Sequence, residues 1–336
     1  MTLPSSLHGN AFPLLRKMLF PFLITLFIIV VTGCKKEALS TISDDSLSAA
    51  SSVSAANASK SSTRVTGFGA WISGYTIDQK MNGCDELKVA YVRDAIILKG
   101  FNGKSGSTDH YTSHGYKILL NLIYENLPDK KATPFPTDMT EYKKLLNKVL
   151  DKYQPEVAVI ENEPTTDVFH TGSIDDYITE LKTAVGVCKR RGIKVADGGL
   201  NLQWVEQVMK GSKSNNHNYL ETKQLLEAYK TIDLDYVNIH THAPFSEHGN
   251  PNVFEEGTLK SVADYIRNEI GKEVMCNEYN QRNKSSKLMN SAVNAFVAAD
   301  IKYFVAHSND NDGKAKSLYN GSRLTFLGDA YKNAIK

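Results

Sequence analysis

Cysteine is scarce in this chain, with four residues among 336, and tryptophan is scarcer, with two. So few cysteines exclude a small scaffold held together by disulfide bonds. A charge excess is also missing, because 39 Lys and Arg stand against 37 Asp and Glu, for a formal net charge of +2. This balance lacks the electrostatic signature of a general nucleic-acid-binding protein, so we expect no nucleic-acid partner. Ten prolines and 22 glycines are too few for a fibrous or wholly disordered chain.

The hydrophobic residues, 41% of the chain, are enough for a substantial buried core. The length predicts one large domain or two ordinary ones. Cys84, Cys188 and Cys276 all fall within predicted strands or helices, so we interpret them as small buried hydrophobic residues and not as bridges or metal ligands.

One long apolar run lies near the N-terminus, at residues 18–32, directly after Arg16 and Lys17. As a helix it would reach about 22 Å, which is less than the roughly 30 Å core of a bilayer. A basic start, an apolar centre and small residues before a cleavage point are typical of a secretory signal. Because Cys34 directly follows Gly33, the segment resembles a bacterial lipoprotein signal; an ordinary signal or an N-terminal anchor is the alternative.

That resemblance implies removal of residues 1–33 and lipidation of Cys34, with palmitate or a similar acyl chain, as the membrane anchor. Residues 34–63 are mostly Ser, Ala, Thr and Asp, which predicts a flexible tether. Residues 64–336 are then a single folded domain. The protein is expected in a bacterial cell envelope, and at the outer membrane, because Lys35 and Lys36 follow the cysteine without the Asp that marks inner-membrane retention in some bacteria.

Eight short apolar segments of this domain have the composition of strands, and several are apolar on both faces, as in a covered parallel sheet. They are residues 65–72, 89–96, 117–124, 156–163, 194–200, 236–242, 273–279 and 302–308. Amphipathic helices are predicted between most of them, at residues 142–153, 174–191, 222–230, 258–270, 288–299 and 326–335. The second unit is the exception, since residues 100–115 are rich in Gly and Ser.

Eight strands that alternate with helices predict an α/β fold, the (β/α)₈ TIM barrel. An open, doubly wound sheet is the competing architecture. No Gly-x-Gly-x-x-Gly motif follows a predicted strand, which disfavours a dinucleotide-binding version of that sheet.

Two glutamates lie where catalytic side chains of a barrel project, at the carboxyl ends of strands. The fourth predicted strand ends in the triplet Asn162–Pro164, and the seventh ends at Glu278. These strands lie on opposite sides of an eight-stranded barrel, so Glu163 and Glu278 can face each other. Such a pair can cleave a glycosidic bond, with one carboxyl as acid and base and the other as nucleophile.

This Asn-Glu-Pro triplet and the glutamate of strand seven resemble the clan A retaining glycoside hydrolases, across residues 64–336. The resemblance implies that Glu163 is the acid/base and Glu278 the nucleophile of a double displacement on a poly- or oligosaccharide. It implies that Asn162 binds the sugar 2-hydroxyl, that Arg93 on strand two steadies the nucleophile, and that His240 on strand six belongs to the site. No cofactor is needed, and a monomer is expected.

Two positions depart from the clan pattern. His242 stands where many members have a Tyr beside the nucleophile, and residues 307–310 end strand eight where many have a Trp. A catalytically inactive carbohydrate-binding barrel is therefore the second hypothesis. Glu161 is expected to face the same way as Glu163 but deeper in the barrel, with Arg93 as a candidate partner.

A third hypothesis is a metal-dependent barrel hydrolase. His240 and His242, two residues apart on one strand, share a face and could bind one metal ion. Ligands that could complete this site are Glu163, Glu278, His307 and Asp310.

Sugar sites also use flat aromatic surfaces. Trp71 lies near the end of the first predicted strand, and Trp204 follows the fifth, on the catalytic face. We therefore place Trp71, Trp204 and His242 among the substrate-binding residues, with ordinary core packing as the alternative for both tryptophans.

Overall fold

The computed structural model describes residues 66–126, 132–243, 254–309 and 317–336. Its strands are β1 (Gly67–Ser73), β2 (Tyr91–Ile97), β3 (Lys117–Ile123), β4 (Val157–Ile160), β5 (Lys194–Asp197), β6 (Leu200–Asn201), β7 (Tyr236–Ala243), β8 (Glu273–Gln281) and β9 (Tyr303–Asn309). Its helices are α1 (Ile77–Leu87), α2 (Gly106–Ser113), α3 (Met139–Leu150), α4 (Ile174–Lys189), α5 (Leu202–Met209), α6 (His217–Tyr229), α7 (Glu256–Tyr265), α8 (Ser286–Ala298) and α9 (Phe326–Ala334). A single π-helical turn, Ile266–Ile270, extends α7.

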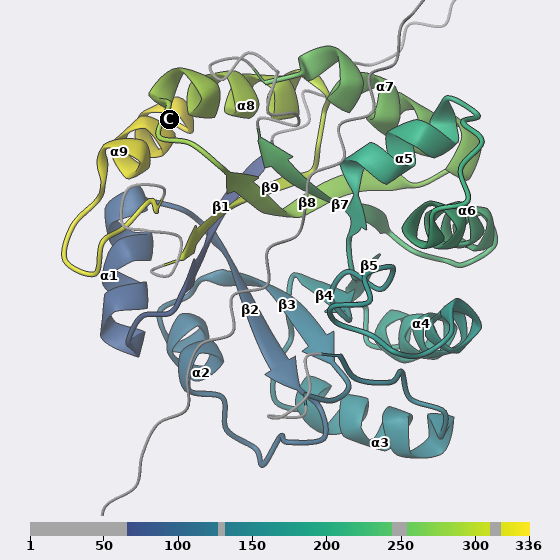
Figure 1. The fold of residues 1–336 in the computed structure, drawn as a ribbon. Coiled ribbons are helices and arrows are strands. Elements are labelled where there is room, and N and C mark those ends of the chain that lie inside the picture. Colours follow the sequence, from purple (N-terminus) through teal and green to yellow (C-terminus); the bar gives the residue numbers. More distant parts are fainter. Residues whose placement is uncertain (1–65, 127–131, 244–253, 310–316) are drawn as a thin grey trace, which may run out of the picture. The chain divides into compact units, whose positions relative to one another are not determined.

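The strands form one parallel sheet in the order β5-β4-β3-β2-β1-β9-β8-β7-β6, and an additional pairing of β5 with β7 closes it. The helices surround the closed sheet (Figure 1). The two-residue strand β6 follows β5 after a short interruption, and both pair with β7. Together they take one strand position, so the barrel has eight strand positions. This confirms the (β/α)₈ prediction, and the closure excludes the open sheet.

Most predicted strands are present, with two differences at the catalytic end. The fourth strand ends at Ile160 and not at residue 163, because Glu161 has a left-handed backbone that leaves the ladder. The fifth is interrupted at Gly198 and Gly199, which separate β5 from β6. Since β6 takes the sixth label, the predicted sixth, seventh and eighth strands are β7, β8 and β9.

Helix α2 forms within the stretch whose Gly and Ser content did not favour a helix. Asp94 of β2 is buried and accepts hydrogen bonds from Ser107 Oγ at 2.9 Å and Thr108 Oγ1 at 2.6 Å. These contacts join the first turn of α2 to the sheet. The helix is therefore stabilised by tertiary contacts and not by the intrinsic helix propensity of its residues.

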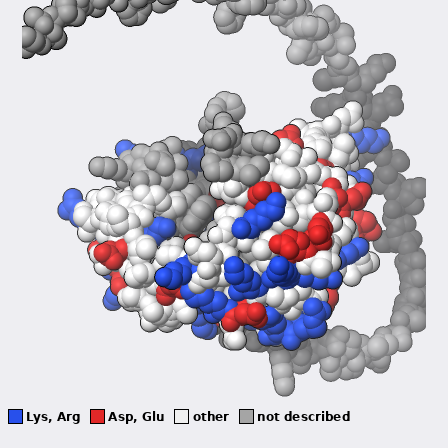
Figure 2. Space-filling model, turned by 90° about the horizontal axis from the view of Figure 1, so that it is seen from below, with Lys and Arg blue, Asp and Glu red and all other residues white. Residues whose placement is uncertain are grey.

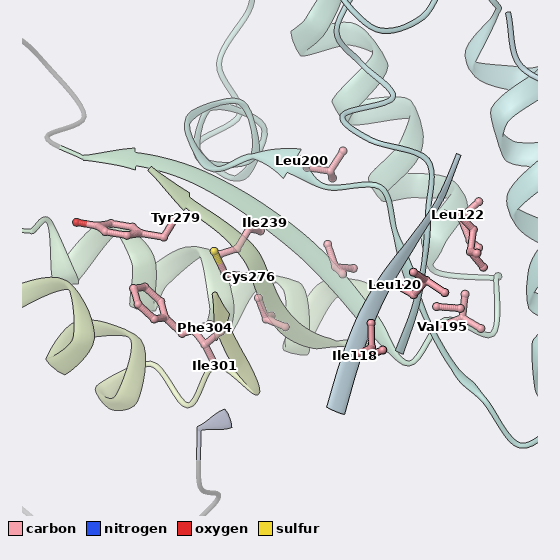
Figure 3. Close-up of a cluster of buried hydrophobic side chains, with 14 of the residues drawn as sticks. Ile118, Leu120, Leu122, Val195, Leu200, Ile239, Cys276, Tyr279, Ile301 and Phe304 are labelled. Atoms are coloured by element: carbon pink, nitrogen blue, oxygen red, sulfur yellow. The ribbon is translucent and has the colours of Figure 1, made fainter. Parts of the chain in front are cut away.

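Strand residues alternate between two apolar layers. Leu119, Val157, Val159, Ala196, Met275 and Val305 fill the interior of the barrel together with Tyr236 and Tyr303. Ile118, Leu120 and Leu122 of β3 point outward and join the larger core between sheet and helices (Figure 3). The apolar interior occupies the amino-terminal half of the barrel, so polar side chains fill the carboxyl-terminal half.

The three described cysteines are free and buried, as predicted. Burial raises the pKa of the Cys84 and Cys188 thiols to about 12. Surface charge is mixed: on the face seen from below in Figure 1, a band of Lys and Arg side chains lies among Asp and Glu side chains (Figure 2).

Within the described residues, no helix combines the length and hydrophobicity needed to cross a membrane. The signal segment, Cys34 and the tether lie outside the described residues, so their roles stay predictions. Asp310 also lies outside them.

Candidate active site

Polar side chains from β7, β8 and the turn after β4 meet at the carboxyl end of the barrel. Glu163 Oε1 lies 2.9 Å from His240 Nδ1, and that nitrogen lies 3.7 Å from Glu278 Oε2. One oxygen of each glutamate and one nitrogen of His240 all lie within 4.8 Å of one another. The structure thus brings together the three side chains that the sequence places on separate strands.

A strained turn after β4 directs Glu163 into the barrel. Glu161 and Glu163 have φ of 66° and 45°, a left-handed conformation that is uncommon for residues other than glycine. The Glu163 amide donates to the Gly198 carbonyl at 3.0 Å. A Cβ on Gly198 would lie 2.6 Å from the Ile160 carbonyl oxygen, so the turn can pack against β5 only because residue 198 is a glycine.

A β-bulge places Glu278. Between Asn238 and His240 of β7 the chain advances two residues, while β8 advances three, from Met275 to Glu278. Strand β8 also has one residue more than β9 in the same stretch. The bulge turns two successive side chains, Asn277 and Glu278, into the barrel, where strict alternation would allow one.

Arg93 is the charge partner of Glu278. The guanidinium is 4% exposed and forms an ion pair with Glu278 Oε2. It also donates to Asn121 Oδ1 at 3.1 Å, to the Asn277 carbonyl at 3.2 Å and to Asn162 Oδ1 at 2.6 Å. Four acceptors from three segments of the chain therefore fix its position.

The carboxylate of Glu278 is held at both oxygens, since Asn280 Nδ2 donates to Oε1 at 2.8 Å. Burial alone would raise the pKa of Glu278, but the positive charge of Arg93, followed by that of His240, outweighs burial. The pKa therefore lies well below its usual range, and Glu278 is ionised at neutral pH.

Trp71 lies beside Arg93, but its ring faces are covered. The Arg93 guanidinium carbon is 4.0 Å from the indole centroid, and the His307 ring stacks on it at 4.0 Å and 17°. Two groups at that distance over one face would collide, so they cover opposite faces. The indole thus offers an edge, and not a flat face, to a ligand.

His307 of β9 and Asn280 of β8 form a hydrogen-bonded pair next to Glu278. His307 Nδ1 lies 2.6 Å from Asn280 Oδ1, and Nε2 lies 2.9 Å from Ser73 Oγ. His307 therefore directs the Asn280 amide, whose Nδ2 supports the second carboxylate oxygen of Glu278.

Among the residues that the structure describes, one group of three has the spacing of metal ligands, and it consists of Glu163, His240 and Glu278. His242 is outside this group; it is partly buried, and burial lowers the pKa of its imidazole. Both nitrogens of His240 lie at hydrogen-bond distance from other side chains, and Arg93 neutralises Glu278. A metal ion would have to displace these contacts, so the residues do not fit one.

Glu161 does not pair with Arg93, contrary to our expectation. Its Oε1 accepts a hydrogen bond from the Tyr124 backbone amide at 2.6 Å. The carboxyl group of Glu180 on α4 interacts with the Glu161 carboxyl group. Burial raises the pKa of Glu161 to about 7. The expectation assumed regular strand alternation from Glu161 to Glu163, which the left-handed turn removes.

Trp204 lies in α5 and is partly exposed. Within the described part of the chain, no hydrogen bond or ring interaction joins it to Glu163, Glu278 or Arg93. Its role in sugar binding stays a prediction.

The sequence reasoning missed three amides of the site, Asn121, Asn277 and Asn280. Asn121 stands alone in the apolar run of β3, and Asn280 lies two residues after Glu278, on the same strand face. The positions of Asn121 and Asn280 in the sequence could therefore have identified both residues as site candidates. Asn277 had no such signal, because its inward direction depends on the bulge.

A cavity of about 310 Å³ lies beside Arg93 and Asn162, on the side of β2 and β3, and neither Glu163 nor Glu278 lines it. Its walls include Trp71, Arg93, Asn121, Asn162 and Phe169. The volume is at the lower end of the range for small-molecule pockets.

No family model and no curated protein matches this sequence. Solved structures that share this fold include glycoside hydrolases. One is a family 39 glycoside hydrolase from the gut symbiont Bacteroides cellulosilyticus WH2, with a TM-score of 0.55 and 14% identity over 81% of this chain and 64% of that chain. This chain thus spans less than two thirds of that enzyme.

This chain also aligns with most of the length of two further structures. A GH128 endo-β-1,3-glucanase from Sorangium cellulosum has a TM-score of 0.51 and 14% identity, over 79% of this chain and 98% of that chain. A GH26 β-mannanase from Bacteroides ovatus has a TM-score of 0.51 and 12% identity, over 81% and 88%. At these identities the likeness shows a shared TIM-barrel fold.

Proposed function

We propose that this chain is a retaining glycoside hydrolase that acts on a poly- or oligosaccharide. The observation that carries the proposal is the spacing of its two carboxyl groups, of which Glu278 is buried and Glu163 partly exposed, with one oxygen of each within 4.8 Å of the other. Retaining enzymes hold their carboxyl groups about 5–5.5 Å apart, whereas inverting enzymes need roughly 6.5–9.5 Å to admit a water molecule. The spacing therefore favours double displacement.

The environments of the two carboxyl groups suit different roles. Glu278, ionised beside Arg93, attacks the anomeric carbon and forms a glycosyl ester, while Glu163 gives a proton to the leaving oxygen. Glu163 then removes a proton from water, which attacks the ester and releases Glu278. Glu163 is the more exposed of the two, with 20% of its side chain accessible against 11% for Glu278. This difference suits contact with both the leaving group and water.

Asn162 is suited to hold the sugar 2-hydroxyl. Its Oδ1 accepts from Arg93, which directs the amide, and within the described residues its Nδ2 has no hydrogen-bond partner. The cavity next to it, with the edge of Trp71, would receive the glycone. We further propose that lipidated Cys34 and the tether hold this barrel at a bacterial membrane, where envelope or environmental glycans are the substrates.

The test is hydrolysis of a panel of polysaccharides and aryl glycosides by the full-length chain. Wild type, Glu278→Gln and Glu163→Ala are compared, and an EDTA-treated sample runs beside them. Glu227→Gln is the matched control, because it removes an exposed carboxyl group of α6 that pairs with Lys230 and does not line the cavity.

Turnover that persists in EDTA and in Glu227→Gln, but is lost in Glu278→Gln, is the expected result. Turnover lost to EDTA would instead favour the metal-dependent hydrolase. Glycan binding without turnover of any substrate would favour the inactive carbohydrate-binding barrel.

A further inference from the structure

Side-chain amides form a buried chain of hydrogen bonds beneath the two glutamates, and their orientations can be deduced from groups that can only donate. Arg93 Nε–H donates to Asn121, so the atom at 3.1 Å is the amide oxygen of Asn121. Asn277 contacts the same oxygen at 3.0 Å and must do so with its Nδ2. The Oδ1 of Asn277 therefore points the other way, toward His240.

A second anchor gives the same orientation independently. The backbone N–H of Asn277 donates to Asn238 at 3.0 Å, which identifies that atom as Oδ1. Asn238 Nδ2 then faces Asn277 and donates to its Oδ1 at 2.8 Å. If the Asn277 amide were rotated by 180°, its Nδ2 would face the Nδ2 of Asn238, and its Oδ1 would face the Oδ1 of Asn121. Both contacts would be unfavourable, and all three side chains are buried.

This orientation determines where His240 carries a proton. His240 Nε2 lies 2.8 Å from Asn277 Oδ1, which can only accept. The donor Asn238 Nδ2 is farther from Nε2, at 3.4 Å, and has Asn277 Oδ1 as its nearer acceptor at 2.8 Å, so Nε2 bears the hydrogen. The other nitrogen, Nδ1, lies 2.9 Å from Glu163 Oε1. With Nε2 already protonated, a hydrogen bond at Nδ1 requires one further proton, located on either the nitrogen or the carboxyl oxygen.

We propose that Asn277 is a positioning residue that keeps a proton on His240 Nε2, so that His240 Nδ1 and Glu163 Oε1 share one additional proton. This inference rests on the proposed function and deepens it, since the shared proton is the one that Glu163 gives to the leaving oxygen. A proton from the attacking water replaces it in the second step, so the pair ends each turnover as it began.

Other charged groups face His240 from neighbouring strands. Glu278 and Glu163 favour its cationic form, while Arg93 and burial oppose it. The carboxylate of Asp197 on β5 and the imidazole of His242 also act on it. Because His240 and Glu163 are in contact, the loss of the shared proton belongs to the pair, and the alkaline limb of the pH–rate profile reports the pair.

Two substitutions at Asn277 should move that limb in opposite directions. Asn277→Leu removes the acceptor at Nε2 and favours the Nδ1–H tautomer, which donates to an ionised Glu163, so the extra proton is lost at lower pH. Asn277→Asp sets a carboxylate against Nε2, which stabilises the imidazolium and keeps the proton to higher pH. We expect shifts of about one pH unit each way in kcat/KM, the usual effect of one adjacent charge or hydrogen bond.

Asn280→Leu is the matched control, because that amide contacts Glu278 and not His240. It should lower kcat while leaving the alkaline limb in place. A purely structural role of Asn277 would lower the rate at all pH values in both variants without moving the limb, and that result would overturn the inference.

A second measurement does not depend on turnover. Two-bond ¹H–¹⁵N spectra of the full-length chain with labelled histidine, assigned with His240→Gln, report the tautomer directly. Protonated Nε2 in the wild type and a change of tautomer in Asn277→Leu are expected; a bare Nε2 in the wild type would overturn the inference. If no glycoside is hydrolysed, the proposed function fails, and this spectrum still decides the tautomer.

Discussion

Replacing Arg93 with Met removes the cation that lies against Glu278 while keeping much of the side-chain volume. Both partners are buried, with side-chain exposures of 4% and 11%. Removing one member of a buried ion pair costs about 3–5 kcal/mol, because the remaining charge is left unpaired. For a domain of this size each kcal/mol lowers the melting temperature by about 2–4 °C, so a drop of roughly 6–20 °C is expected at neutral pH.

The loss should depend on pH with a definite sign. In the wild type the pKa of Glu278 is depressed, so its contribution to stability is present above its unfolded-state pKa and is lost as pH falls toward the folded-state pKa. In Arg93→Met, burial dominates and raises that pKa, so protonation stabilises the variant. The difference between the two proteins should therefore be largest near pH 7 and shrink as pH falls through about 4.

Thermal melts of both full-length proteins at several pH values measure this difference. Arg191→Met is the matched control, because Arg191 pairs with Asp151 at the surface, where an ion pair contributes about 0–1 kcal/mol. Arg93→Met/Glu278→Gln should recover part of the loss, since no unpaired charge remains. An equal loss at every pH, or no loss at pH 7, would refute the reasoning.

Three further predictions concern the site. Gly199→Ala places a Cβ 2.3 Å from His240 Nε2 at a φ of 105°, so it should cost at least about 1–3 kcal/mol and impair turnover; a wild-type melt and rate would contradict the close packing. Glu163→Gln should lower kcat by about 10²–10⁴ for poor leaving groups and much less for activated aryl glycosides, whereas equal losses on both substrates would argue against an acid role. EDTA should leave kcat unchanged, and restoration of a lost rate by a divalent ion would reverse our conclusion on metal.

The eight-strand alternation was predictable because each strand is a short apolar run bounded by polar residues or glycine. Glu163 and Glu278 were predictable for a related reason, since parallel strands bring their carboxyl ends to one edge of the barrel, whereas Arg93 was predicted from the family resemblance. Neither inference needs the details of side-chain packing.

The details of the site depend on backbone irregularities that periodicity cannot show. The left-handed turn at Glu161 directs that side chain away from Arg93, and the bulge in β8 brings Asn277 inward. Covering of Trp71 by Arg93 and His307 depends on three strands meeting in space. Helix α2 likewise depends on a distant contact, with Asp94.

The central claim is that Glu278 forms a covalent bond to the sugar. The most direct test treats the full-length chain with a panel of activated 2-deoxy-2-fluoro glycosides, which slow hydrolysis of the ester, and locates the label by peptide mass spectrometry. The account predicts one glycosyl group on the peptide that contains Glu278, and none in Glu278→Gln. A label on another residue, or hydrolysis with inversion at the anomeric carbon, would contradict it.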